Sequence, residues 1–249
     1  RVTADIQARR RLGLTATLVR EDGLETDVFS LIGPKCFDIP WEALEKQGWI
    51  AQAECHEIRV PLPLEQRREY VMSPLRAQYR IASENPLKLD VLESLLERHK
   101  DNRVLIIGQY LKQLKIVSGA FHIPLITGQT PNQEREKLYE QFRQGEINRL
   151  VVSKVANFAV DLPEANVAIQ ISGTFGSRQE EAQRLGRILR PKSDGQIAMF
   201  YSVITRDSSE GEFAQKRQRF LTEQGYSYQI QTMEEVINAI PDALTSRTG

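Results

Sequence analysis

The sequence contains little cysteine, and this limits how the chain can be stabilised. Cys36 and Cys55 are the only cysteines among 249 residues, and no C-x-x-C pair occurs. Neither a disulfide framework nor a zinc module can be built from them. His56, His99 and His122 lie far apart in sequence, so we expect no metal site and no catalytic base among them. This composition fits a reducing compartment, and we expect the protein in the cytoplasm.

Long apolar runs and an excess of charge of one sign are also absent. No stretch approaches the roughly eighteen consecutive apolar residues of a membrane-spanning helix, and residues 1–5 do not resemble a signal peptide. We therefore expect a protein that is neither membrane-bound nor exported. The 33 basic residues balance 33 acidic ones, which excludes a uniformly basic surface but not a local basic groove. An initiator methionine is missing, and we interpret the chain as a piece of a longer protein.

The remaining composition, with 41% hydrophobic and 27% charged residues, is typical of a globular protein with a real core. After residue 85, short apolar runs alternate with amphipathic stretches. The runs that predict buried strands are 104–107, 123–126, 150–152, 167–171 and 197–204. Regular strand–helix alternation predicts right-handed crossovers and a parallel sheet covered by helices on both faces. The fold class over residues 85–240 is therefore α/β.

Three helices are marked by their end signals. The first spans 85–99 and opens with an Asn-Pro pair, in which the asparagine caps the helix. The second spans 130–145, with a capping-box pattern at Thr130 and a glycine at its end. The third spans 177–191, with another capping box at Ser177 and a terminating proline.

The region before residue 85 follows a different pattern. Residues 11–19 contain a strand-like run, and 30–50 are loop-rich with a short helix. Residues 53–63 predict another strand. One interpretation of this whole region is that it is the tail of a neighbouring domain. The stretch 64–85 mixes arginines with tyrosines, as nucleic-acid surfaces do, but a solvated helical connector has the same composition.

The sharpest candidate for chemistry lies in the third predicted helix. At 100° per residue, Gln183, Arg187 and Arg190 fall within a wedge of roughly 60°, and Gly186 would let another surface come close. Two guanidiniums and an amide aimed in one direction suit a triphosphate presented by a partner domain, as in an arginine finger. The alternative is that Arg187 and Arg190 only offset the helix dipole at its C-terminal end.

Two loops that follow predicted strands are further candidates. One runs from Ser153 to Asp161 at the carboxyl end of a strand, where ligands bind in open α/β sheets, although Asp161 could instead be a turn residue before a proline. The other contains Gly128 and Thr130, whose N–H groups and hydroxyl could hold a phosphate. This second signal is weak alone, because every helix needs a start.

In order and spacing these elements resemble the second motor domain of superfamily 2 helicases, and in detail the bacterial-type XPB family of DNA repair helicases. Residues 14–22 resemble motif III followed by the R-E-D element, which is associated with unwinding. The other matches are motif IVa at 128–130, motif V at 152–155 and 161–165, motif VI at 183–190, and runs at 172–182 and 218–226 that are similar to bacterial members.

The resemblance implies a role for each candidate residue. Arg187 and Arg190 would contact the γ-phosphate side of ATP, and Gln183 would position the nucleotide or its attacking water. Asp161 would help to close the nucleotide cleft, to which Gly186 also belongs. The residues that would couple hydrolysis to strand movement and unwinding are Thr15, Thr17, Arg20, Glu21 and Asp22. Those that would hold backbone phosphates of the tracked strand are Gly128, Thr130 and Ser153.

The resemblance also implies a domain layout. A RecA-like second motor domain would span 51–240, with an abbreviated thumb-like segment at 64–85. The end of a first motor domain and a linker would occupy 1–50, and a tail 241–249. Neither G-x-x-x-x-G-K-[ST] nor a D-E-x-H or D-E-x-D run occurs in the chain. We therefore expect ATP with Mg²⁺ to be bound mainly by the first motor domain, and this chain to be inactive alone.

By resemblance the chain is expected to be the C-terminal motor half of an ATP-dependent 3′–5′ DNA helicase that serves nucleotide excision repair. Expected partners are single-stranded DNA and fork junctions, the first motor domain of the same protein and a repair nuclease, with no membrane. The expected location is the bacterial cytoplasm, at the nucleoid. The alternative is a non-catalytic RecA-like module that binds DNA or a partner nuclease without nucleotide.

Overall fold

The computed structural model describes residues 10–13, 25–37, 39, 43–44, 47, 53–153, 165–173, 197–223 and 226–239. Its N-terminal part contains helix α2 (Glu25–Ile32), and residues 10–13 have no regular secondary structure. Most of the strand-like run predicted at 11–19 lies outside the described residues. No helix in the part that the structure describes is long and apolar enough to cross a membrane.

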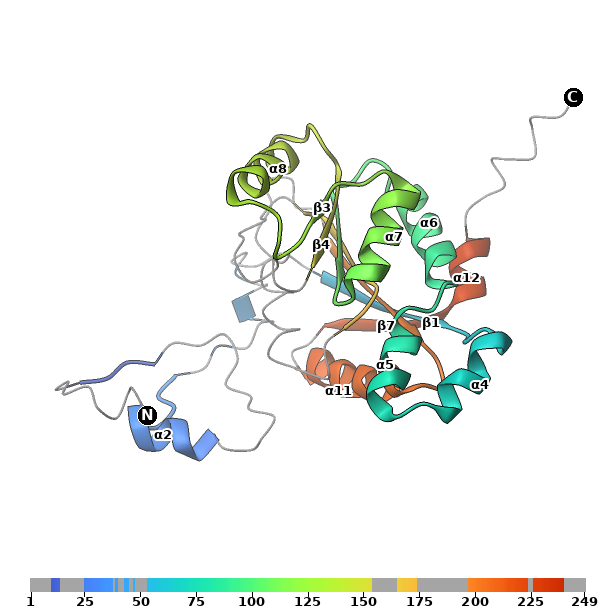
Figure 1. Cartoon of the computed structure of the whole chain (residues 1–249). Coiled ribbons are helices and arrows are strands. Elements are labelled where there is room, and N and C mark those ends of the chain that lie inside the picture. Colours follow the sequence, from blue (N-terminus) through green and yellow to red (C-terminus); the bar gives the residue numbers. More distant parts are fainter. Residues whose placement is uncertain are drawn as a thin grey trace, which may run out of the picture.

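The described residues form a seven-stranded sheet with the order β3-β4-β2-β5-β6-β1-β7 (Figure 1). All the paired strands run parallel, which confirms the predicted parallel α/β fold. The strands are β1 (Ala53–Val60), β2 (Val104–Gly108), β3 (Leu125–Ile126), β4 (Arg149–Ser153), β5 (Val167–Gln170), β6 (Ala198–Thr205) and β7 (Ser227–Thr232).

Strand β1 lies inside this sheet, between β6 and β7, and not in a neighbouring domain. For residues 53–60, this excludes the interpretation of the region before residue 85 as the tail of a neighbouring domain. Ile58 and Val60 of β1 are fully buried in the same core as the later strands. The position of β1 along the chain concealed this, because its partners follow it only after four other strands.

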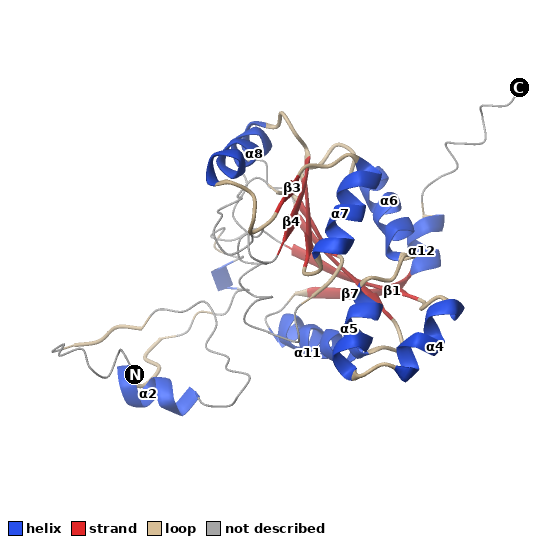
Figure 2. Ribbon diagram, in the orientation of Figure 1, coloured by secondary structure: helices blue, strands red, loops and turns tan. Residues whose placement is uncertain are grey.

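Helices cover both faces of the sheet (Figure 2). One face carries α6 (Lys88–Arg98), α7 (Leu111–Phe121) and α12 (Met233–Asn238), and the other carries α8 (Asn132–Gln144) and α11 (Ser209–Glu223). Successive side chains of a strand point to opposite faces. Accordingly, Val104 and Ile106 of β2 pack in the core under α6 and α7, while Leu105 and Ile107 pack in the core under α8.

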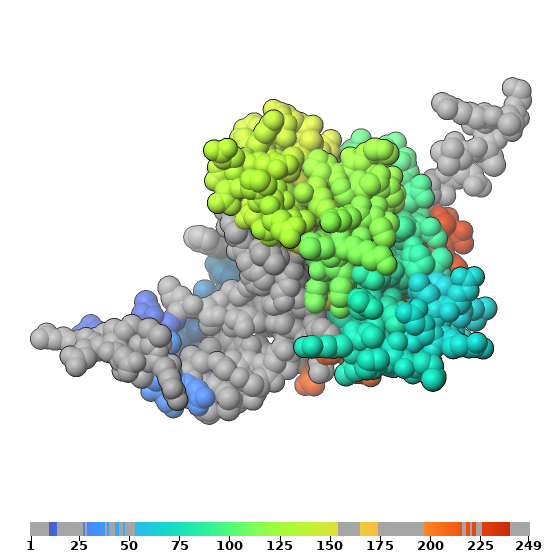
Figure 3. Space-filling view, in the orientation of Figure 1, coloured from blue at the N-terminus to red at the C-terminus, as the bar shows by residue number. Residues whose placement is uncertain are grey.

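Two further helices, α4 (Leu64–Met72) and α5 (Leu75–Ser83), occupy the segment that was predicted to be thumb-like. They form a hairpin that contacts α11 through α5. In the space-filling view the cyan atoms of this hairpin lie next to the green atoms of α7 (Figure 3). The segment is helical, and both alternatives, a nucleic-acid surface and a solvated connector, stay predictions.

The predicted helix ends were partly right. Gly145 ends α8 with a φ of 78°, as predicted. Helix α6 begins at Lys88 with Leu87 as its N-cap, so Asn85 does not cap it; the Asn85 side chain accepts from the Leu87 N–H at 3.1 Å in the turn before it. Thr130 does not cap α8, which starts at Asn132. Its hydroxyl accepts instead from the Thr127 N–H at 2.9 Å, so the capping-box prediction is wrong. The third predicted helix, at 177–191, lies outside the described residues.

A buried polar cluster joins β1, β6 and α6 on one face of the sheet. The His56 ring stacks on Tyr201 with centroids 4.9 Å apart, and His99 Nε2 lies 2.9 Å from the Tyr201 hydroxyl. Burial lowers the pKa of both histidines. Glu54 raises the pKa of His56 and Asn102 raises the pKa of His99, but both effects are smaller than the effect of burial. In the described residues no three His, Cys, Asp or Glu side chains are grouped so that they could hold a metal ion.

The lowered pKa values make a prediction for stability against pH. The free energy of unfolding should fall as the pH drops below the ordinary histidine value of 6.5, because the unfolded chain then binds more protons than the folded chain. The histidine contribution is complete above the unfolded pKa and is lost as the pH falls toward the folded pKa. Urea unfolding at about pH 7.5 and about pH 5.5 measures the difference.

The charged and polar side chains that act on these two histidines are Glu54, Arg98, Asn102 and Gln231, and Tyr201 contacts both rings. A His99→Gln variant should show a smaller loss of stability between the two pH values. A His122→Asn variant, at an exposed position with positive φ, should show the same loss as the wild type. If His99→Gln lost as much stability between the two pH values as the wild type, the pH dependence could not be assigned to His99.

Candidate functional site at the carboxyl edge of the sheet

The carboxyl ends of four adjacent strands place candidate residues in one row. Gly108 at the end of β2 is in parallel register with Ser153 at the end of β4. Thr127 and Ile171 each follow the last paired residue of the neighbouring strands β3 and β5. In open α/β sheets this edge is where ligands bind, outside the carboxyl ends of the strands.

The turn after β3 is held by two hydroxyls and a guanidinium. The Thr130 hydroxyl accepts from the Thr127 N–H at 2.9 Å, and the Thr127 hydroxyl accepts from the Gln129 N–H at 3.1 Å. Arg135 Nη2 donates to the carbonyls of Thr127 and Thr130 at 3.3 and 3.1 Å. Gly128 and Gln129 are exposed at the tip. The hydroxyls of Thr127 and Thr130 lie 3.5 Å apart, and Arg135 places a positive charge beside this turn, which suits a phosphate.

Ser153 Oγ, Gln109 Oε1 and Arg135 Nε are buried polar atoms at this edge that have no hydrogen-bond partner in the part of the chain that the structure describes. Ser153 is 3% exposed, and its Oγ atom makes no hydrogen bond. Gln109 is partly exposed, but its Oε1 atom is buried and also makes no hydrogen bond. An unsatisfied buried polar atom costs on the order of 1–3 kcal/mol. Such atoms are rare in native proteins and call for an explanation, such as a ligand or another segment.

The ends of β2 and β5 are held close together. The Gln109 N–H donates to the Ser172 hydroxyl at 2.8 Å, and a Cβ atom on Gly108 would lie 2.7 Å from Leu114 and 3.0 Å from that same hydroxyl. Only glycine fits at position 108 without displacing α7 or the end of β5. Next to it, burial and the carboxylates of Glu210 and Glu84 raise the pKa of Tyr110.

A buried ion pair between Lys88 and Glu210 holds the ends of β5 and β6 at this edge. Lys88 Nζ donates to both carboxylate oxygens of Glu210, at 2.8 and 3.1 Å, and to the Ile171 carbonyl at 2.9 Å. The two charged side chains are only 2% and 3% exposed. Glu210 also accepts from the Thr205 N–H and the Ser83 hydroxyl, both at 2.9 Å. The pair thereby connects α5, α6, α11 and the ends of β5 and β6.

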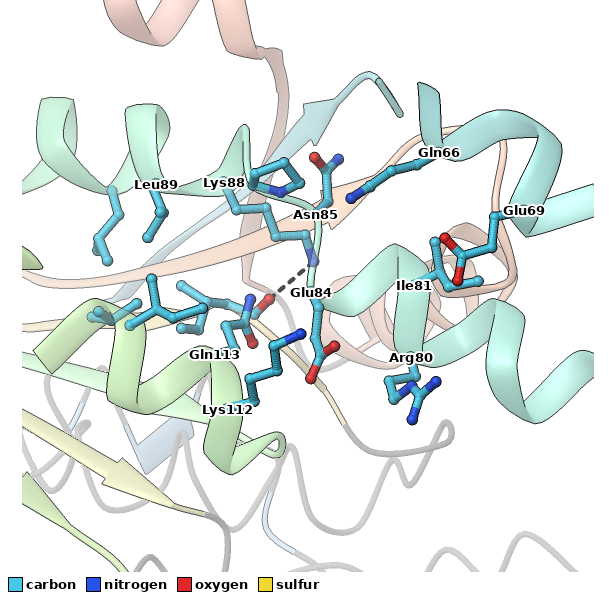
Figure 4. A pocket seen from close by; sticks show the side chains of 15 residues that line it. Gln66, Glu69, Arg80, Ile81, Glu84, Asn85, Lys88, Leu89, Lys112 and Gln113 are labelled. Atoms are coloured by element: carbon cyan, nitrogen blue, oxygen red, sulfur yellow. Dashed lines mark hydrogen bonds between the residues drawn. The ribbon is translucent and has the colours of Figure 1, made fainter. Parts of the chain in front are cut away.

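A cavity of about 570 Å³ opens between the α4–α5 hairpin, α6 and α7 (Figure 4). Lys88 reaches into it between Asn85 and Gln113, and the dashed line marks its bond to the Ile171 carbonyl. Gln113 Nε2 donates to the Ser83 carbonyl at 2.6 Å. The cavity therefore lies directly over the network that holds the end of β5.

Of the predicted site residues, the structure describes Gly128, Thr130 and Ser153, and it brings them to the same edge on neighbouring strands. The roles of these three residues stay predictions. So do the roles of the other site residues, which lie outside the described part: Thr15, Thr17, Arg20, Glu21, Asp22, Asp161, Gln183, Gly186, Arg187 and Arg190.

Several residues of this edge were not found from sequence. Arg135, Gln109 and Tyr79 carry no local pattern that separates them from ordinary surface or core residues. Lys88 did carry a signal, because a lysine four positions before Leu92 lies on the apolar face of its helix. A charge at such a position needs a buried partner, which here is Glu210.

Residues 44–248 match the model of the ERCC3/RAD25/XPB C-terminal helicase family. The chain belongs to this family. A Mycobacterium tuberculosis protein named DNA 3′-5′ helicase XPB is 57% identical over 237 residues, which are 95% of this chain and 43% of that protein. The Saccharomyces cerevisiae general transcription and DNA repair factor IIH subunit XPB/SSL2 is 38% identical over 248 residues, 97% of this chain and 29% of that protein. The chain thus spans less than half the length of these curated relatives.

Solved structures of low sequence identity share the fold. S. cerevisiae Dbp5 bound to RNA and ADP BeF3 matches with a TM-score of 0.62 at 13% identity, over 88% of this chain and 51% of that chain. The E. coli DEAD-box protein SrmB, bound to regulator of ribonuclease activity A, matches with 0.53 at 14% identity, over 74% and 93%. These likenesses confirm the RecA-like helicase C-terminal fold.

The buried ion pair generates a stability prediction. Lys88→Met should lower the free energy of unfolding by about 3–5 kcal/mol, because the Glu210 carboxylate would remain buried without its counter-charge. The double variant Lys88→Met/Glu210→Gln should recover part of this loss, since a neutral amide needs no counter-charge. Urea unfolding of these variants measures both effects.

Arg143→Met is the matched control, because it breaks an ion pair with Glu140 that is exposed on α8. Its unfolding midpoint should stay close to that of the wild type. A Lys88→Met variant that is as stable as this control would contradict the predicted contribution of the buried pair to the free energy of unfolding.

Proposed function

We propose that this chain is the C-terminal motor half of an ATP-dependent 3′–5′ DNA helicase or translocase of the XPB type, acting in DNA repair and specifically in nucleotide excision repair. The observation that carries the proposal is the 57% identity over 95% of the chain to a protein named DNA 3′-5′ helicase XPB. The RecA-like sheet, with candidate phosphate contacts at its carboxyl edge, is consistent with that activity.

ATP with Mg²⁺ would lie against a first motor domain that supplies the phosphate-binding loop and the metal ligands. From this chain, Arg187 and Arg190 would reach the γ-phosphate, and Gln183 would position the attacking water. A guanidinium there stabilises the charge that develops in the transition state, so it acts mainly on the rate of hydrolysis. Asp161 and Gly186 would close the cleft on this side.

The tracked DNA strand would lie along the row at the carboxyl edge. The hydroxyls of Thr130 and Ser153 and the exposed turn at Gly128 would contact backbone phosphates. Two observations support this: Arg135 places a positive charge beside the exposed turn, and Ser153 Oγ has no partner among the described residues. The residues that would couple hydrolysis to strand movement are Thr15, Thr17, Arg20, Glu21 and Asp22.

The proposed partners are single-stranded DNA, fork junctions, the first motor domain of the same protein and a repair nuclease. The proposed location is the bacterial cytoplasm, at the nucleoid. The neutral net charge supports a motor that makes a few phosphate contacts and releases them in each cycle, because a strongly basic surface would hold DNA too tightly.

DNA-stimulated ATP hydrolysis tests the proposal most directly. It should be compared between the 249-residue chain and the longest chain that the gene encodes. We expect activity only in the longer chain, because this chain has no phosphate-binding loop motif. Activity in neither would favour a non-catalytic module that binds DNA or a nuclease, and activity in the short chain would contradict the assignment of the nucleotide site.

Arg187→Ala, made in the longest chain, tests the arginine finger. Its kcat for ATP hydrolysis should fall by about 10³-fold or more, while nucleotide binding stays nearly intact, since a finger acts on the transition state. Arg143→Ala, an exposed arginine on α8, is the control and should keep the wild-type kcat. Wild-type turnover in Arg187→Ala would refute the assignment.

Ser153→Ala tests the phosphate contact at the end of β4. Because Ser153 Oγ is buried and makes no hydrogen bond within the described structure, its removal should raise the free energy of unfolding by about 1–3 kcal/mol and weaken single-stranded DNA binding by about threefold to tenfold. Ser118→Ala is the converse control, since the Ser118 hydroxyl donates to the Ile123 carbonyl at 2.7 Å. It should lose stability and keep its DNA affinity. Unchanged DNA affinity in Ser153→Ala would exclude this contact.

A further inference from the structure

The three residues that follow β5 are each held by a different element. The Ile171 carbonyl accepts from Lys88 Nζ of α6 at 2.9 Å, and the Ser172 hydroxyl accepts from the Gln109 N–H after β2 at 2.8 Å. The Gly173 carbonyl accepts from the Tyr79 hydroxyl of α5 at 2.9 Å. Gly173 is also the last described residue before the sequence segment 174–196.

The side chain of Tyr79 is held in one orientation by its neighbours. Its side chain is 1% exposed, and its ring meets Phe213 of α11 edge to face, with centroids 5.5 Å apart and planes at 77°. Aromatic pairs prefer this arrangement, and a buried tyrosine hydroxyl needs a partner. The ring contact with α11 therefore orients the hydroxyl toward Gly173, and the hydrogen bond cannot move without repacking α5.

The rest of the α4–α5 hairpin is fastened to the same edge. The Tyr70 hydroxyl of α4 accepts from the Ser209 N–H at 2.8 Å, and the Thr205 hydroxyl donates to the Ala82 carbonyl at 2.7 Å. The outer side of the hairpin is exposed at Val71 and Met72. A displacement of α5 would thus be transmitted to the end of β5 through Tyr79 and to the end of β6 through the Ala82 contact.

We propose that Tyr79 is a positioning residue for the arginine-bearing segment, because its hydroxyl ties the Gly173 carbonyl, the start of that segment, to the α4–α5 hairpin. The inference rests on the proposed function. The helix predicted to carry Arg187 and Arg190 begins four residues after Gly173, at Ser177. A catalytic group misplaced by about 1 Å can cost up to 100-fold in rate, so a loosened anchor acts on kcat.

Tyr79→Phe in the longest chain that the gene encodes removes only this hydroxyl. The kcat of DNA-stimulated ATP hydrolysis should fall roughly tenfold, with the KM for ATP and the affinity for single-stranded DNA within about twofold of wild type. Tyr70→Phe is the matched control, since it deletes the hydroxyl that bonds Ser209 and does not touch Gly173. Its kcat should stay within about twofold of wild type.

Amide hydrogen exchange separates a positioning role from general loosening. Peptides that cover residues 165–173 should exchange faster in Tyr79→Phe than in wild type, and at the wild-type rate in Tyr70→Phe. If Tyr79→Phe does not fold, Phe213→Leu keeps the hydroxyl but removes the ring that orients it, and should lower kcat by about threefold.

The outcomes are distinguishable from failure of the proposed function. A wild-type protein without DNA-stimulated ATP hydrolysis would refute the proposed function itself. An active wild type with an unchanged kcat in the folded Tyr79→Phe or Phe213→Leu variant would overturn the role of Tyr79 alone. Equal losses of kcat in Tyr79→Phe and Tyr70→Phe would also overturn it, because they would reflect the hairpin as a whole.

Discussion

The buried ion pair between Lys88 and Glu210 sets the geometry of the carboxyl edge. Removing two charges from water is costly, and the pair is tolerated only because its remaining hydrogen-bonding capacity is satisfied. Its partners are the Ile171 carbonyl, the Thr205 N–H and the Ser83 hydroxyl, which come from two strand ends and a helix. Displacing any of them would leave a charge short of a partner. The edge is therefore held as one unit and does not adjust piece by piece.

This rigidity has a functional side. Above the ion pair, the ends of β2 and β5 are held by the Gln109–Ser172 hydrogen bond and by the lack of space around Gly108. The turn at Gly128 is held by its own hydroxyls and by Arg135, whereas Ser153 Oγ has no hydrogen bond among the described residues. A rigid scaffold with a few polar atoms left unpaired is suited to a ligand that is bound and released repeatedly, because no reorganisation is required each time. The scaffold belongs to the fold, while its loops carry the specific chemistry.

Local patterns predicted much of the fold. Apolar runs located the buried strands β2, β4, β5 and β6, and the glycine at position 145 marked the end of α8, since both signals depend on neighbouring residues alone. Strand β7 was not predicted, because it lies at the edge of the sheet and its polar, largely exposed residues give no apolar run. The Thr130 cap failed because its hydroxyl had a nearer partner in the preceding turn. The Tyr79–Gly173 contact joins residues 94 positions apart, which no local pattern reveals.

The place of β1 in the sheet has a consequence for how the chain folds. Its only strand partners in the described structure, β6 and β7, are made last. When β1 leaves the ribosome, roughly 140 further residues must be synthesised before the first of these partners exists, and such long-range pairing is intrinsically slow. Ile58 and Val60 reach their fully buried positions only when these strands are in place. The sheet therefore cannot be completed until nearly the whole domain has been translated, and a chain that ends before residue 198 would leave β1 without a strand partner.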